Sequence, residues 1–421
     1  MKNKIILCFL LSLVIIFGQT GCTKKNNNEI AFEEGLAMPK PGSALAEAEL
    51  SVEKETGNNG ETLAVEADEP LYNRVSFVGC GDNIIYYGNI RDAKSLSDGT
   101  REYNFKPMFE RVKEKIANAD IAFINQETVM AGEGYALSYY PRFNSPRDVG
   151  YDLVELGYDV INIANNHMLD KGAEGLERTI DFWNGMDCLM IGGYRNDKDY
   201  DTVRVLEKNG IKTAFLAYTF YTNGLSKGKD SELAIPYLDN DDIVRQTQLA
   251  GESADFIIAS VHWGNEGAFL PNAEQKRVAQ LLSDCGVDVI LGHHPHVIQP
   301  VEWITGKNGN KTLCVYSLGN FAAEQAYAYN MVGGIIEFDI VSKDGGEPYV
   351  ENPVFNPTVF HFDSGFYNNT VYFMQDYTSE LAAEHGVRTY YKRSLTTEML
   401  HSYVKKYISS EFLPKDLVFE N

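Results

Sequence analysis

The chain has 421 residues, a formal net charge of −22 and an ordinary globular composition, with 44% hydrophobic and 23% charged residues. This acidity argues against a nucleic-acid-binding protein, because no basic excess is available to neutralise phosphates. Six cysteines are too few for a disulfide scaffold in a chain of this length, and the eight histidines matter more by position than by number.

The first 22 residues have the layout of a bacterial secretory signal. A basic start precedes an apolar run over residues 5–17, and small and polar residues then lead to Cys22. The run is short for a membrane span, and a cysteine in this place indicates lipoprotein processing, in which Cys22 carries the lipid. An uncleaved anchor and a simple secreted protein are the alternatives, since Gln19 stands where such signals usually have an aliphatic residue. We expect the rest of the chain to lie at the extracellular face of a bacterial cell membrane.

Residues 23–70 have the composition of a disordered acidic linker. Eleven acidic residues outnumber four lysines, and large apolar residues are few. Such a segment cannot bury enough surface to offset the entropy of ordering. We therefore expect a spacer between the lipid anchor and the folded part of the chain.

From residue 71 onward, apolar strand patterns alternate with amphipathic helix patterns. The predicted elements in chain order are strand 75–79, helix 106–119, strand 121–124, helix 147–156, strand 159–164, helix 174–185, strand 189–191, a hairpin of 203–208 and 211–217 around Asn209-Gly210, helix 241–252, strand 256–261, helix 273–285, strands 287–291, 297–304, 312–317 and 334–340, and helix 394–408. Short strands rich in Val and Ile, joined by helices, indicate an α/β fold with buried sheets. We assign residues 71–341 to one domain and residues 342–421 to a C-terminal extension packed on it.

Polar side chains follow six of these strands, at the ends where α/β folds commonly bind their ligands. The segments are Gly79-Cys80-Gly81-Asp82-Asn83, Asn125-Gln126-Glu127, Asn165-Asn166-His167 with Asp170, His262-Trp263-Gly264-Asn265-Glu266, Gly292-His293-His294-Pro295-His296 and Ser317-Leu318-Gly319-Asn320-Phe321. Each member alone has an ordinary structural interpretation, such as a helix cap or a hydrogen-bonded core histidine. The set as a whole, with five of the eight histidines, indicates one site at a sheet edge.

Carboxylate, amide and imidazole groups in this combination suit Mn²⁺, Fe or Zn²⁺. Two such metals can activate water and stabilise an in-line displacement at phosphorus. His167 followed by Asp170 supplies an imidazole and a carboxylate that can orient it for protonating a leaving group. The chain has no Cys-x-x-Cys pair, so a thiolate zinc site is not expected.

These ordered motifs resemble the CapA family of poly-gamma-glutamate capsule biosynthesis proteins over about residues 74–340. The resemblance implies a fold similar to calcineurin-like metallophosphoesterases, which is a two-sheet α/β/β/α sandwich. It also implies a role in the synthesis, export or anchoring of poly-gamma-glutamate at the bacterial surface. The implied partners are an anionic polymer or a phosphorylated substrate, the membrane through the lipid anchor, and subunits of a membrane polymer synthase.

The resemblance further implies roles for individual residues. The implied ligands of a divalent metal are Asp82, Glu127, Asn166, His262, His293, His294 and His296, with the choice between His293 and His294 left open by their spacing. The implied catalytic residues are His167 and Asp170. The implied substrate contacts are Asn83, Asn125, Asn165, Trp263, Glu266 and Asn320. The remaining histidines, His361, His385 and His401, are expected to be structural or on the surface.

One position departs from the phosphoesterase pattern, in which Asp-x-His is common at the first motif. This chain has Asp82-Asn83-Ile84 there, so one ligand of a first metal is missing. Hydrolysis at two metals, a site for one metal, and anion binding without turnover therefore remain alternatives. At the level of the whole protein, the alternatives to a capsule role are a metal-dependent phosphoesterase of the cell envelope and a non-catalytic scaffold subunit of a membrane polymer synthase.

Overall fold

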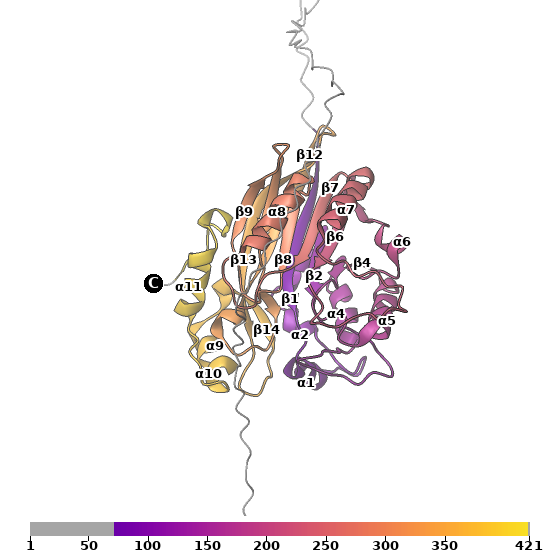
Figure 1. The fold of residues 1–421 in the computed structure, drawn as a ribbon. Coiled ribbons are helices and arrows are strands. Elements are labelled where there is room, and N and C mark those ends of the chain that lie inside the picture. Colours follow the sequence, from indigo (N-terminus) through magenta and orange to yellow (C-terminus); the bar gives the residue numbers. More distant parts are fainter. Residues whose placement is uncertain (1–70, 420–421) are drawn as a thin grey trace, which may run out of the picture. The chain divides into compact units, whose positions relative to one another are not determined.

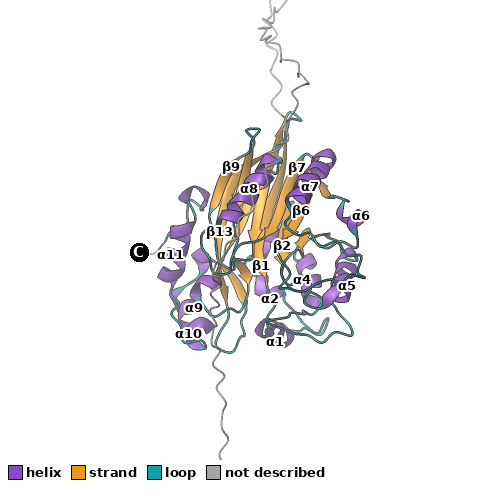
Figure 2. Ribbon diagram, in the orientation of Figure 1, coloured by secondary structure: helices purple, strands orange, loops and turns teal. Residues whose placement is uncertain are grey.

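The computed structural model describes residues 71–419. These residues form two β-sheets that share one apolar core, with helices on the outer sides (Figures 1 and 2). The predicted signal segment, Cys22 and the predicted linker lie outside the described residues. Within residues 71–419, no helix combines the length and the apolar composition needed to cross a bilayer.

The first sheet has the strand order β14-β13-β12-β1-β2-β3-β4, and β11 pairs with the end of β1. Its strands are β1 (Tyr72–Asn83), β2 (Ile121–Gln126), β3 (Val160–Asn162), β4 (Leu189–Ile191), β11 (Asn320–Ala322), β12 (Val332–Lys343), β13 (Tyr349–His361) and β14 (Thr370–Phe373). β1 runs parallel to β2 and antiparallel to β12, and β2 runs parallel to β3. The carboxyl ends of β1, β2 and β3 therefore lie at the same edge of the sheet.

The second sheet has the strand order β5-β6-β7-β8-β10-β9. Its strands are β5 (Arg204–Lys208), β6 (Ile211–Thr219), β7 (Phe256–His262), β8 (Val289–His293), β9 (Val301–Thr305) and β10 (Lys311–Val315). β6, β7, β8 and β10 are parallel neighbours. The hairpin between β5 and β6 turns at Asn209 (φ 49°) and Gly210 (φ 77°), the two left-handed positions that a type I′ turn requires, so the predicted hairpin is confirmed.

Side chains along β7 alternate between two apolar cores. Ile258 lies in the core between the sheets with Phe215 of β6, whereas Ile257 and Ala259 lie in a second core. This second core lies beneath α7 (Asn240–Ser253) and α8 (Ala273–Asp284), which cover the outer face of the second sheet (Figure 1). A period of two with apolar residues on both faces is what a strand buried between two layers requires. The predicted two-sheet α/β sandwich is confirmed.

The other helices surround the first sheet and the edges of the molecule (Figure 2). They are α1 (Tyr87–Ser95), α2 (Lys106–Phe109), α3 (Lys113–Ala117), α4 (Asp148–Glu155), α5 (Gly172–Asn184), α6 (Asp197–Tyr200), α9 (Ser379–Glu384), α10 (Gly386–Thr389) and α11 (Thr397–Tyr407), with 3₁₀ turns η1 (Ala328–Met331), η2 (Met374–Asp376) and η3 (Ser410–Phe412). The prediction of one helix over 106–119 is wrong. The backbone N–H groups of Glu110 and Val112 donate to carbonyls only three residues back, and this 3₁₀ spacing separates α2 from α3.

The start of α8 fixes the loop that follows β7. Asn272 Oδ1 accepts the backbone N–H of Gln275 (2.8 Å), and Gln275 Oε1 accepts that of Asn272 (3.0 Å), which makes a capping box. The amide of Gln275 also donates to Gln299 (2.8 Å), whose own amide donates to the Ala268 carbonyl (2.7 Å). The loop between His262 and α8 is therefore tied to the body of the fold.

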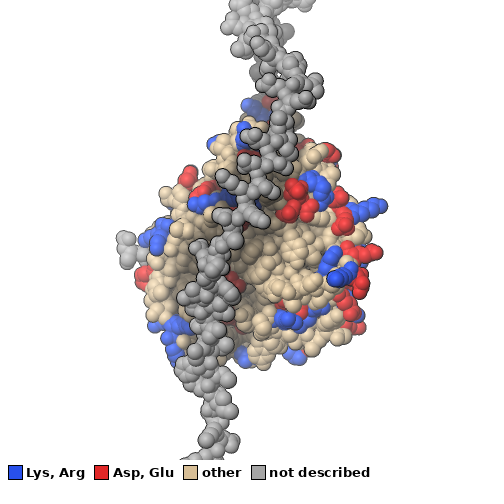
Figure 3. Space-filling model, in the orientation of Figure 1, with Lys and Arg blue, Asp and Glu red and all other residues tan. Residues whose placement is uncertain are grey.

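Charged side chains of both signs are interspersed on the face of the molecule that Figure 3 displays. They do not gather there into one basic patch. The absence of a nucleic-acid partner remains a prediction from the composition.

Candidate metal centre and tyrosine cleft

Asp82 is the fully buried centre of the candidate site, near the end of β1. Its backbone N–H donates to the carbonyl of Gly319 (2.9 Å), and Asp82 itself pairs in parallel with Asn320 of β11. Gly81 permits this approach, because a Cβ atom there would lie 2.2 Å from the Gly319 oxygen. The backbone of β1 is thereby held against the chain at residue 319.

The carboxylate of Asp82 binds groups from both sheets. Oδ1 accepts the side-chain amide of Asn125 (2.9 Å) and lies 3.0 Å from His293 Nδ1. Oδ2 accepts the backbone N–H of His294 (3.2 Å) and lies 3.1 Å from His296 Nδ1. In this arrangement the Asp82 carboxylate organises the loop that follows β8.

That loop has unusual backbone angles. His294 has φ 94° and His296 has φ 55°, backbone angles in the left-handed region that residues other than glycine rarely adopt. Such angles cost about 1–3 kcal/mol each and persist only where surrounding contacts fix them. The two hydrogen bonds to Asp82 Oδ2 supply that fixation.

Four buried residues, which we call the histidine cluster, present side-chain atoms suited to a metal: Glu127, His262, His294 and His296. Ligand atoms of Glu127, His294 and His296 all lie within 4.8 Å of one another, and Nε2 of His262 and Nε2 of His296 each lie 3.6 Å from Glu127 Oε1. Glu127 Oε1, His262 Nδ1 and His294 Nδ1 are buried without a hydrogen-bond partner. Buried polar atoms are normally paired, so a bound group would complete the bonding here. A carboxylate with imidazoles fits a divalent transition-metal ion.

His294, and not His293, belongs to this cluster. Ligand atoms of His294 lie within 4.8 Å of those of Glu127 and His296, a group that does not include His293. His293 Nδ1 lies against Asp82, its ring stacks on Phe123 with centroids 5.8 Å apart, and its Nε2 is buried without a hydrogen-bond partner. His293 supports Asp82, while His294 faces Glu127 and His296.

Burial and neighbouring charges shift the pKa values of the site residues in different directions. Burial, reinforced by the charge of Asp82, raises the pKa of Glu127 well above its usual value. Burial alone would lower the pKa of His296, but Glu127 and Asp82 outweigh it and raise that pKa to about 9. Burial and then the neighbouring His296 lower the pKa of His294 to about 3. His294 is therefore a neutral imidazole with a lone pair available for a ligand, which is the form that binds metals.

Asn166 and His262 contact each other, as expected for two residues of one site. His262 Nε2 lies 3.0 Å from Asn166 Oδ1. Burial, with added repulsion from His294, holds the pKa of His262 well below its ordinary value, so this imidazole is also neutral. The amide of Asn166 donates to Asn223 (3.3 Å) from the loop after β6, a residue that the sequence analysis did not single out.

His167 and Asp170 form the predicted pair. His167 Nδ1 lies 2.8 Å from Asp170 Oδ2, which also accepts the backbone N–H of Phe143 (2.6 Å). The ring of Phe143 packs edge-on against the imidazole, with centroids 4.8 Å apart. The imidazole is therefore oriented as general acid catalysis requires. Its catalytic role remains a prediction.

Three of the four predicted substrate-binding asparagines, Asn83, Asn125 and Asn165, are buried in the framework around the cluster. The amide of Asn125 donates to both site carboxylates, Asp82 (2.9 Å) and Glu127 (3.1 Å). Asn83 donates to the side chain of Gln126 (2.7 Å), and Asn165 donates to the backbone carbonyl of the same residue (3.1 Å). These contacts hold β1, β2 and the loop after β3 together.

Two further positions lie in apolar surroundings. Trp263 packs in the core beneath α7 and α8 and donates its indole N–H to the Tyr316 carbonyl (2.9 Å), so the structure does not bring its side chain to the cluster. Ile84 occupies the position where the phosphoesterase pattern commonly has a histidine. It packs with Phe143 and Ala323 in a small apolar cluster.

A cleft of about 870 Å³ opens beside the histidine cluster, with His296 and Glu266 in its wall. We call it the tyrosine cleft, because its lining includes the tyrosines at 86, 87, 139, 140, 327, 329, 390 and 391. Asn320, a predicted substrate contact, borders it by donating to the Asn330 carbonyl (3.0 Å). The sequence analysis missed the tyrosines, although a signal was present: all three Tyr-Tyr doublets of the chain lie in this lining.

The family of bacterial capsule synthesis proteins, PGA_cap, matches residues 76–325, which is more than half of the chain. The PGA biosynthesis protein CapA of Bacillus subtilis (strain 168) is 29% identical over 204 residues, covering 48% of this chain and 52% of that protein. The capsule biosynthesis protein CapA of Bacillus anthracis is 31% identical over 197 residues, covering 46% of each. The chain thus spans about half the length of the curated relatives it matches.

Among solved structures, the calcineurin-like phosphoesterase YfkN of Bacillus subtilis is 13% identical, with a TM-score of 0.39, over 80% of this chain and 97% of that one. A score of this size supports no inference about activity. The matched residues 76–325 include every residue of the histidine cluster together with Asp82, His167 and Asp170.

Proposed function

The chain belongs to the bacterial capsule synthesis protein family, and from this premise we propose that it acts in the synthesis, export or anchoring of poly-gamma-glutamate or a related surface polymer. The names of its Bacillus relatives support the choice of polymer. The observation that carries the proposal is the histidine cluster, because its buried, unpartnered ligand atoms lie within the part of the chain that matches the family.

In this proposal the histidine cluster holds one divalent cation. The proposed ligands are Glu127, His262, His294 and His296, and Asp82 fixes the backbone that carries two of them. A bound cation supplies positive charge to an anionic group of the polymer or its precursor. The chain's own contribution is a largely buried setting in which His167 is oriented by Asp170.

The test is complementation of a deletion strain by the full chain and its variants. Glu127→Gln and His294→Gln are expected to abolish surface poly-gamma-glutamate, measured with a polymer-specific antibody. The exposed Glu252→Gln on α7 is a matched control and is expected to restore normal output. Normal polymer from stable Glu127→Gln protein would overturn the proposal of a functional metal centre. A requirement for the chain but not for its cluster would support the scaffold alternative.

A second candidate is metal-dependent phosphoester hydrolysis, which is favoured by the His167–Asp170 pair beside the cluster. Purified full chain with added Mn²⁺ would be assayed on a generic aryl phosphate. Turnover that is lost in His167→Gln but kept in Glu252→Gln would support hydrolysis. Metal binding without turnover would leave the one-metal, non-hydrolytic site as the better description.

The anchor is a separate proposal, supported by the signal-type sequence that ends at Cys22. Cys22→Ser should release the chain from the membrane fraction and prevent incorporation of labelled fatty acid. Unchanged fatty-acid labelling in this variant would overturn lipidation at Cys22.

A further inference from the structure

We propose that the tyrosine cleft binds a neutral saccharide chain, a ligand class distinct from the anionic polymer. The cleft is of the size that small-molecule and oligomer segments occupy, at about 870 Å³. The inference deepens the proposed function, since the cleft shares His296 with the histidine cluster. The saccharide would be the surface component that the protein binds next to the anionic polymer.

Several rings of the cleft are unusually exposed. Tyr140 is 73% exposed, Tyr390 54%, Tyr87 52% and Tyr327 45%. Large apolar rings that stay in water at the rim of a concave surface indicate a binding site more often than a fold requirement. Pyranose rings have apolar C–H faces that stack on aromatic rings, and tyrosine adds a hydroxyl that can bond to the sugar.

Hydrogen bonds fix the backbone of the cleft walls before any ligand binds. The amide of Asn89 in α1 donates to Asn369 (2.9 Å), and Asn369 donates from its backbone and its side chain to Asp92 (2.8 and 2.9 Å). These buried bonds join the wall that carries Tyr87 to the C-terminal segment. The backbone that carries Tyr87 therefore needs little ordering when a ligand binds.

The lining of the cleft carries few ionic groups. Among the described residues that line it, Glu266 and Glu324 are acidic, His296 is the basic group, and there is no lysine or arginine. The nearby Arg393 already lies over the ring of Tyr327, 3.6 Å from its centroid. A poly-glutamate segment or a nucleotide would find no lysine or arginine in this lining to pair with. Sugar hydroxyls can bond to Glu266, Glu324 and His296 without adding a charge, so the lining favours a neutral, hydroxyl-rich ligand.

Glu324 supplies an independent indication of a missing partner. The residue is only 6% exposed, and its Oε2 accepts the backbone N–H of Gly88 (2.9 Å), while Oε1 is buried with no partner. Gly88 makes room for this carboxyl group, because a Cβ atom there would lie 2.1 Å from Oε1. Burial raises the pKa of Glu324 to about 8, so at neutral pH the group both donates and accepts hydrogen bonds, as sugar hydroxyls require.

The test is calorimetric titration of the full chain, in the presence of a chelator, with a β-1,4-linked N-acetylglucosamine tetramer, cellotetraose and a γ-glutamyl tetrapeptide. Saturable binding of at least one saccharide and none of the peptide is expected. Tyr140→Ala and Tyr390→Ala should each weaken saccharide binding by about tenfold. Tyr140→Phe, which keeps the aromatic ring, should retain most of the wild-type affinity. Tyr349→Ala alters another exposed ring (42%), on β13 and outside the cleft, and should leave binding unchanged.

Three results would overturn the inference: no saturable binding of either saccharide at millimolar concentration, binding that survives the Tyr140/Tyr390 double variant, or preferential binding of the γ-glutamyl peptide. Saccharide binding should persist in Glu127→Gln, because this substitution alters the histidine cluster and not the tyrosines. Failure of the saccharide site is therefore distinguishable from failure of the proposed metal function.

Discussion

Two pairs of buried histidines in this molecule look alike by burial and differ in bonding. The rings of His361 and His385 have centroids 5.0 Å apart, and those of His262 and His294 are 4.8 Å apart. Burial lowers the pKa in all four. His361 Nδ1 lies 2.9 Å from the Tyr377 hydroxyl and both nitrogens of His385 are bonded, whereas Nδ1 of His262 and of His294 has no partner. A lowered pKa marks burial, and an unsatisfied nitrogen marks a candidate site.

The largest expected effect is a loss of protein stability when a histidine of the first pair, His361 and His385, is replaced. His385→Ala would leave two buried backbone groups without partners, the Phe360 carbonyl and the Val387 N–H. We expect the free energy of unfolding to fall by about 3 kcal/mol, measured by denaturant titration. Affinity for Mn²⁺ in the folded protein should not change. A loss of metal binding without a loss of stability would reverse the roles we assign to the two pairs.

The matching substitution at the histidine cluster should have the opposite result. His294→Gln removes a ligand nitrogen but breaks no side-chain hydrogen bond, because Nδ1 has none. We expect affinity for Mn²⁺ to fall by about a hundredfold in a calorimetric titration, while unfolding in the absence of metal changes little. Wild-type affinity in this variant would show that the cluster is not the metal site.

The dependence of stability on pH gives a smaller effect. The folded-state pKa of His361 is about 4, lower than the ordinary value of 6.5, so the unfolded chain binds more protons between these values. The stability that the neutral His361 contributes is therefore complete above pH 6.5 and is lost as the pH falls toward 4. Removing this group in His361→Gln should reduce the slope of unfolding free energy against pH by about 1 kcal/mol per unit near pH 5. Parallel slopes for the two proteins would contradict the lowered pKa.

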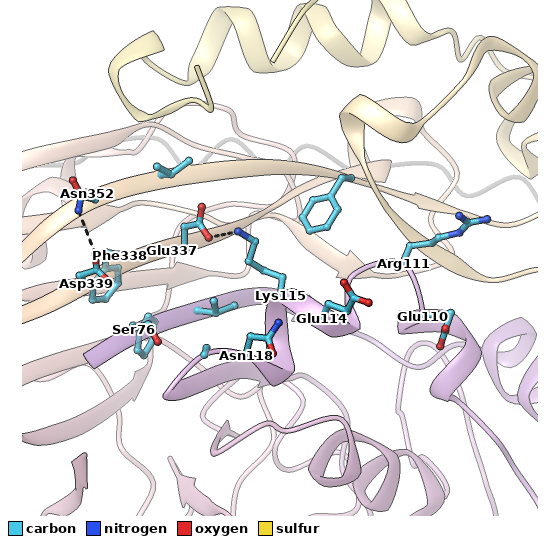
Figure 4. Close-up of a pocket in the computed structure, with 15 residues that line it drawn as sticks. Ser76, Glu110, Arg111, Glu114, Lys115, Asn118, Glu337, Phe338, Asp339 and Asn352 are labelled. Atoms are coloured by element: carbon cyan, nitrogen blue, oxygen red, sulfur yellow. Dashed lines mark hydrogen bonds and ion pairs between the residues drawn. The ribbon is translucent and has the colours of Figure 1, made fainter. Parts of the chain in front are cut away.

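The smallest effect is expected at a polar contact outside both pairs. Lys115 and Glu337 form an ion pair of 2.5 Å across the groove that Figure 4 displays, with side chains 36% and 26% exposed. Partly exposed ion pairs contribute about 0–1 kcal/mol, so Lys115→Ala should change the free energy of unfolding by less than that. If Lys115→Ala lowered the free energy of unfolding as much as His385→Ala, burial would not explain the difference between the ion pair and the buried histidine.

The sequence predicted the sheet-and-helix framework and the meeting of six strand ends, because both follow from local patterns. The short apolar run over 256–261 and the Asn209-Gly210 turn are examples that need no distant partner. The sequence left the choice between His293 and His294 open, since it depends on which ring Asp82 engages from another sheet. It also placed Trp263 at the site, because residue spacing does not show that this indole bonds to Tyr316.

The Tyr-Tyr doublets are visible in the sequence, but their meeting in one cleft could not be predicted, because the walls come from segments that are far apart in the chain. Residues 86–87 and 390–391 face one cleft only after the C-terminal segment has joined α1 through Asn369. Strands β13 and β14 were also missed, and they are the elements that carry the chain back to that wall. A long-range contact of this kind has no local signature in the sequence.

The bonds from Asp82 to His293 and His296 join residues 211 and 214 positions apart. Contacts of such long separation form late, because the entropy of closing the intervening chain must first be overcome. A growing or partly folded chain therefore carries Asp82 long before it can assemble the histidine cluster. Any fragment that ends before residue 293 should lack metal affinity altogether. Metal uptake would then act as a check on assembly, since only a chain with both sheets closed can capture the ion.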